Sequence, residues 1–117
     1  MILDDLVRSV VTGDLLAARQ WIADARRERF DWSACPQPDG SSDLELAIGA
    51  GLVELLAQRD GIEPPSWAKE IGPHEDLVIL DPGLDKMPRS FTRAKESGPE
   101  PLRKRNLIAL PDFLDVA

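Results

Sequence analysis

The segment "SSDLELAIGAGLVELLAQRDG" at 41–61 places the strongest constraint on the fold. Ser42 and Glu45 form an S-x-x-E capping box that begins a helix, and Gly61 is a typical helix stop. Apolar residues occupy nearly every face between them, and the polar strip consists of Glu45, Glu54, Gln58 and Arg59. A helix that is apolar nearly all round must be buried on most sides. This helix is therefore predicted to be central to the core, or else to lend one face to another chain.

Two glycines interrupt this helix, at positions 49 and 51. Each costs roughly 1 kcal/mol relative to alanine in a helix interior. Gly49 and Gly51 are therefore expected where another part of the backbone comes close to the helix.

The flanking sequence predicts further helices. Apolar side chains recur at helical spacing over residues 2–10 and 14–29, and residues 88–97 begin with a proline and end at a glycine. After Pro64-Pro65, Ser66 is expected to cap a short helix. Residues 77–80, "LVIL", fit a strand or a helical turn equally well, whereas "NLIAL" at 106–110 is expected to be a strand.

These elements predict a mainly α fold, a small helical domain with a short strand and an irregular, proline-rich C-terminal half. A length of 117 residues is typical of one domain over residues 1–117. Within it we expect a helical core over about 2–60 and a C-terminal module over about 61–117.

Charge is distributed unevenly along the chain. The net charge is −7, yet residues 86–105 carry +5, so the rest carries −12. An acidic net charge argues against a dedicated nucleic-acid binder, because phosphate binding needs a large basic field. The basic stretch has three interpretations: a charged surface paired with acidic neighbours, a patch that faces a protein partner, or a weak contact with DNA or RNA.

Localisation follows from a few simple features. The N-terminal "MILDDLVRSV" carries two acids where a signal peptide would be basic, and no stretch approaches the roughly 20 apolar residues of a membrane span. A single cysteine, Cys35, excludes an internal disulfide. We therefore expect a cytoplasmic protein that does not insert into a membrane.

No residue pattern predicts catalysis. "GSSDLEL" at 40–46 superficially resembles the metal-binding motif of nucleotidyltransferases, but two carboxylates in the first turn of a helix point in different directions. Cys35 and His74 are too few for a zinc site, and neither lies in a segment that would activate a nucleophile. We expect no enzyme activity, no catalytic residues, no cofactor and no metal.

Two segments carry a family resemblance, "LVELLAQRDGIEPPSWAKE" at 52–70 and "PEPLRKRNLIALPDFLDV" at 99–116. A helix that ends at a glycine, a P-P-x-W step and a basic R-x-R-N run before an apolar strand resemble an antitoxin-like module of bacterial, especially actinobacterial, toxin–antitoxin operons. That module also occurs fused to Cro/C1-type helix-turn-helix regulators. The present sequence has no helix-turn-helix segment, so operator binding is not expected of it.

The resemblance implies an inhibitory protein that neutralises a cognate toxin, of a nucleotidyltransferase-like kind, by direct contact. The alternatives are a non-catalytic adaptor, including a homodimer formed through the apolar helix, and an accessory domain of a transcription regulator. The partner-binding residues expected from the resemblance and the basic stretch are Trp67, Arg89, Arg93, Leu102, Arg103, Lys104, Arg105, Asn106, Phe113 and Leu114.

Overall fold

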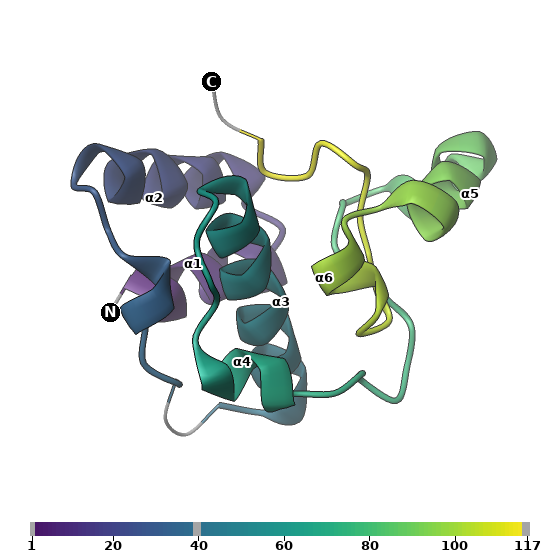
Figure 1. Ribbon diagram of the computed structural model, residues 1–117. Coiled ribbons are helices and arrows are strands. Elements are labelled where there is room, and N and C mark those ends of the chain that lie inside the picture. The colour runs from purple at the N-terminus through teal and green to yellow at the C-terminus, as the bar shows by residue number, and fades with distance from the viewer. Residues whose placement is uncertain (1, 39–40, 116–117) are drawn as a thin grey trace.

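The computed structural model describes residues 2–38 and 41–115 and shows a mainly helical domain, as predicted (Figure 1). Its helices are α1 (Ile2–Val11), α2 (Leu15–Arg27), α3 (Asp43–Arg59), α4 (Ser66–Glu70), α5 (Pro88–Ser97) and α6 (Glu100–Arg103). Two 3-10 helices, η1 (Trp32–Ala34) and η2 (Leu84–Lys86), and two short strands, β1 (Val78–Ile79) and β2 (Leu107–Ile108), complete the described elements.

Helix α3 lies in the middle of the molecule and packs against α1, α4, α6 and η1 (Figure 1). Every residue from 47 to 57 is buried, which confirms the central-core interpretation of this helix. Its capping box is also present, because Ser42 Oγ accepts from the Glu45 amide and Glu45 Oε1 accepts from the Ser42 amide. Since these residues are buried within their own chain, α3 offers no comparable apolar face for a homodimer.

The two glycines of α3 differ in their surroundings. A Cβ on Gly51 would lie 2.7 Å from Leu102 Cδ2 and 3.3 Å from the carbonyl oxygen of Pro101, so α6 packs directly on this position. A Cβ on Gly49 would meet nothing closer than 3.5 Å, a side-chain atom of Val7. The expected close backbone approach is therefore found at Gly51 and not at Gly49.

The N-terminal helices follow their apolar periodicity. Leu3, Leu6, Val7 and Val10 of α1 are buried, and α1 packs against both α2 and α3. Helix α2 begins where expected, because the Asp14 carboxylate accepts from the amide of Ala17 at 3.0 Å. In α4, by contrast, Pro65 is the N-cap and Ser66 is the first helical residue, so the predicted serine cap is wrong.

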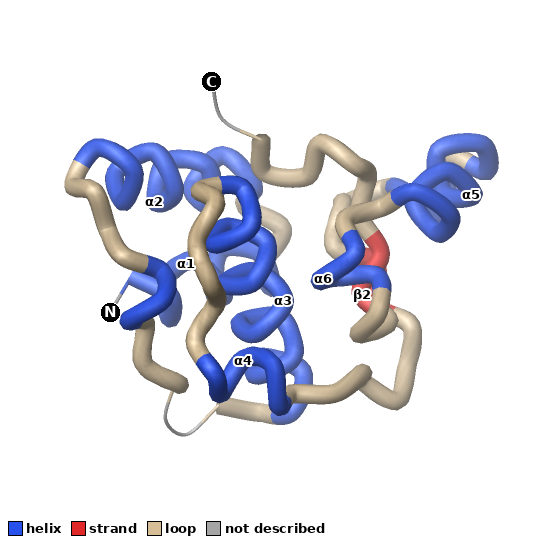
Figure 2. The backbone as a smooth tube through the Cα atoms, viewed as in Figure 1, coloured by secondary structure: helices blue, strands red, loops and turns tan. Residues whose placement is uncertain are grey.

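The C-terminal half packs on α3 through α6, and it also contains a small parallel sheet, of which Figure 2 labels β2. Strand β1 pairs with β2 in the register Val78 to Leu107 and Ile79 to Ile108, which identifies "LVIL" as a strand. Beyond β2, the chain contributes Phe113 and Leu114 to the main core. The core thus combines residues from both halves of the chain.

Candidate functional site

The basic stretch at 86–105 contains cations that pair with a carboxylate and cations that do not. Lys104 and Arg105 form ion pairs with Glu54, whereas Lys86, Arg89, Arg93 and Arg103 are exposed. The paired cations connect the C-terminal segment to α3, whereas the others face solvent.

Arg105 lies inside the protein, with only 1% of its side chain exposed. Its guanidinium Nη2 donates to Glu54 Oε1 at 2.5 Å and to the carbonyl oxygen of Ala68 at 2.7 Å. Nη1 donates to the carbonyl of Pro101 at 2.7 Å, and Nε donates to that of Ile71 at 3.0 Å. One side chain therefore connects α3, the C-terminal end of α4 and α6, as the planar fork of an arginine allows.

Glu54 is the anionic partner in this cluster. Desolvation alone would raise its pKa, but hydrogen bonds from Arg105 and Lys104 outweigh burial and hold the pKa below its ordinary value. Lys104 Nζ lies 2.9 Å from the second carboxylate oxygen, and its side chain stays 45% exposed. The carboxylate is therefore ionised and paired at neutral pH.

Four predicted partner-binding residues are internal and need correction. Arg105 is enclosed by the carbonyls and carboxylate described above, and Leu102, Phe113 and Leu114 are at most 2% exposed. These side chains pack against α3 and the core of their own chain, so none of them is offered to a partner. The apolar character of the C-terminal segment reflects intramolecular packing.

Trp67 and Asn106 also make internal hydrogen bonds. Trp67 is half-buried, and its Nε1 donates to the carbonyl of Cys35 at 2.7 Å. Asn106 adopts a left-handed backbone conformation, with φ of 65°, and its Nδ2 donates to the carbonyl of His74 at 2.6 Å. Asparagine tolerates this conformation better than most residues, which explains its place directly before β2.

The residues that the resemblance singled out therefore come together, although they are distant in the sequence. Pro65 and Trp67 precede the carbonyls of Ala68 and Ile71, which accept from Arg105, and Asn106 holds the loop that follows. The R-x-R-N run at 103–106 is thus hydrogen-bonded to residues 68–74, which follow α3 in the sequence.

The exposed cations gather on and beside α5. Arg89 and Arg93 lie four residues apart and so share one helical face, with Lys86 shortly before the helix. Arg103 of α6 reaches α5, because its Nη1 donates to the carbonyl of Glu96 at 2.7 Å. Among residues 2–38 and 41–115, no carboxylate forms an ion pair with any of these four cations. The interpretation of the stretch as an internally paired surface therefore fails for them.

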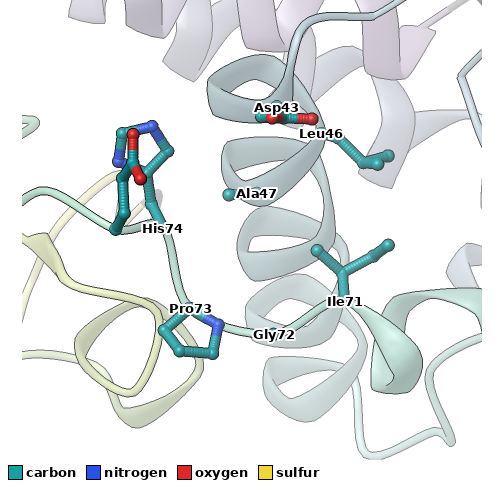
Figure 3. A pocket seen from close by; sticks show the side chains of 8 residues that line it. Asp43, Leu46, Ala47, Ile71, Gly72, Pro73 and His74 are labelled. Carbon is teal, nitrogen blue, oxygen red and sulfur yellow. The ribbon is translucent and has the colours of Figure 1, made fainter.

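A pocket of about 330 Å³ opens between the first turns of α3 and residues 71–75 (Figure 3). Leu46, Ala47 and Ile71 provide apolar walls, and the ionisable side chains that line it are Asp43, His74 and Glu75. The His74 amide donates to the carbonyl of Arg105 at 3.0 Å, so the C-terminal segment holds this wall in place. The charged residues that line this pocket are acidic, whereas most of the charged residues on α5 are basic.

Cys35 is poorly suited to nucleophilic chemistry. Its side chain is 2% exposed, and burial, assisted by the nearby charge of Asp4, raises the pKa of the thiol to about 11. A thiol of this kind stays protonated at neutral pH, whereas nucleophilic cysteines have lowered pKa values. In the described part of the chain, no group of three or more His, Cys, Asp or Glu residues could hold a metal ion.

The comparisons with known proteins give no family. Neither protein-family profiles, nor curated proteins, nor solved structures yielded a match to this chain. Within the described residues, no helix is both long enough and apolar enough to span a bilayer.

Sequence reasoning missed the role of Glu54, which it assigned to a polar strip. The available signal was a single carboxylate among the apolar residues 46–57, which calls for a cationic partner elsewhere in the core. Arg105, at the end of the basic run before β2, is that partner.

Proposed function

We propose that this chain is a non-catalytic inhibitory protein of the antitoxin type, which neutralises a cognate toxin by direct protein–protein contact. The observation that carries the proposal is the convergence of the antitoxin-like pattern on one structural unit. Trp67 lies next to Ala68, whose carbonyl accepts from Arg105, and Asn106 continues the same network. The residues that carry the resemblance to the antitoxin-like module therefore also lie together in the folded protein.

The charge distribution supports a binding function. The chain is acidic overall, yet it presents cations on α5 that have no partner among the described carboxylates. Exposed charges of this kind steer association with a complementary protein. A nucleotidyltransferase-like toxin is the kind of partner that the resemblance implies.

Growth and complex formation test this proposal. The product of the neighbouring gene is expressed in a bacterial host with and without the present chain, and the two purified proteins are then mixed and separated by size-exclusion chromatography. We expect growth arrest only without the chain, and co-elution of the two proteins. If growth is the same in both cultures and the proteins elute separately, the proposal is wrong, whereas co-elution without any effect on growth supports the adaptor alternative.

A further inference from the structure

Helix α5 is set apart from the main core. Its principal packing partners are η2 and β2, and it lies at the edge of the molecule, away from α1 and α2 (Figure 1). Of its ten residues, Ala94 alone is buried, beside Leu84 and Ile108 in a small second core. Most of the helix surface is therefore open to solvent.

The open face of α5 carries cations at regular spacing. Arg89 and Arg93 share this face, and the hydrogen bond from Arg103 to Glu96 brings a third guanidinium to the end of the helix. Glu96 lies on the same face, but among the described residues neither it nor any other carboxylate forms an ion pair with Arg89, Arg93 or Arg103. The cations on this face therefore outnumber the carboxylate, and an acidic partner would be attracted to the excess positive charge.

An apolar anchor point lies at the start of the same helix. Met87 is 46% exposed, and a shallow hollow of about 420 Å³ is lined by Met87, Pro88, Arg89 and Ser90. Methionine adapts its shape to apolar partners, and tight interfaces combine an apolar anchor with a charged rim. Residues 86–93, from the end of η2 into α5, provide both parts.

We propose that the outer face of α5, formed by Lys86, Met87, Arg89, Arg93 and Arg103, docks an acidic segment of a partner protein that carries an apolar anchor residue. The anchor occupies the hollow beside Met87, and its carboxylates pair with the arginines. This inference rests on the proposed function insofar as the partner is the toxin.

A protein partner fits this face better than a nucleic acid does. The one aromatic residue of α5, Phe91, is half-buried and lies under Lys95, whose Nζ is 5.6 Å from the ring centroid. The face therefore lacks exposed rings on which bases could stack.

Fluorescence anisotropy with synthetic peptides tests the proposal. The probe is a labelled peptide of alternating Glu-Asp pairs and leucines, and its control replaces each acid with the corresponding amide. We expect the acidic peptide to bind at low salt, about 50 mM, and the amide peptide to bind at least about tenfold more weakly. Equal affinity for the two peptides, or no binding of the acidic one, would overturn the proposal.

Charge-reversal variants locate the binding site. Arg89→Glu/Arg93→Glu should weaken acidic-peptide binding at least about tenfold, whereas Arg19→Glu/Arg29→Glu on and after α2 changes the net charge equally and should leave it within about twofold. Circular dichroism is used to check that both variants fold. An equal loss of peptide affinity in the two variants would indicate non-specific attraction. Tighter binding of duplex DNA than of the peptide would assign the face to nucleic acid. Either result overturns the proposal.

The same variants separate this inference from the proposed function. If the wild-type chain neutralises the toxin and Arg89→Glu/Arg93→Glu neutralises it equally well, the α5 docking site is wrong and the antitoxin function stands. If the wild-type chain does not neutralise, the function fails, and the peptide measurements alone decide whether α5 binds acidic segments.

Discussion

Replacing Glu54 with glutamine is expected to destabilise the fold strongly. The change keeps the shape of the side chain but leaves the Arg105 charge buried without an anion. Removing one partner of a buried ion pair typically costs about 3–5 kcal/mol. Three backbone carbonyls still accept from the guanidinium, so we expect the lower end, about 3 kcal/mol. For a domain of this size that is a fall in Tm of about 12 °C.

The pH dependence of this loss provides a second, independent measurement. Because the pKa of folded Glu54 lies below the ordinary value of 4.5, its ionisation stabilises the fold fully above that pH. The contribution disappears as the pH falls below 4.5 and through the lower pKa of the folded state. The stability difference between wild type and Glu54→Gln should therefore be largest at neutral pH and should narrow in acid.

Urea unfolding followed by circular dichroism, repeated across this pH range, measures both effects. Glu63→Gln is the matched control, because Glu63 pairs with Lys69 at an exposed site and should contribute little. A loss below about 1 kcal/mol at neutral pH, or a difference independent of pH, would refute the role assigned to the buried pair.

Three further outcomes follow from local geometry. Gly49→Ala should stabilise the protein by up to about 1 kcal/mol, because the new methyl group meets only ordinary contacts. Gly51→Ala should instead destabilise it by about 1–3 kcal/mol, because the methyl group would displace α6. Thermal unfolding measures both variants, and a shift of Tm in the same direction for the two would contradict this reasoning. Cys35 should react with a thiol reagent far more slowly in the native protein than in urea, and equal rates would show that the thiol is accessible. Ser42→Ala should cost about 1 kcal/mol through the lost cap, as measured by urea unfolding, and an unchanged midpoint would argue against the capping box.

Local sequence signals predicted the helical part of the fold well. The capping box at Ser42 and Glu45, the cap at Asp14 and the apolar periodicity of residues 2–10 depend on neighbours within a few residues. Such interactions are visible in the sequence, because their partners lie a turn or less away.

Long-range pairing was the part that sequence reasoning could not supply. The R-K-R run at 103–105 consists of consecutive cations, and nothing local distinguishes Arg105, which is buried, from Arg103, which is exposed. The difference arises because Glu54, 51 residues earlier, faces one of them across the core. Phe113 and Leu114, predicted to bind a partner, are covered by their own chain, since a sequence shows that an apolar side chain needs covering but not by what.

The return of the C-terminal segment to α3 affects how the protein folds during synthesis. Until residues 102–114 have left the ribosome, one side of α3 lacks Leu102 and Leu107, and Glu54 lacks its cations. A nascent chain in this state exposes the apolar surface that chaperones and proteases recognise. Arrival of residues 102–114 therefore covers α3, and a product that stops before them would be open to degradation.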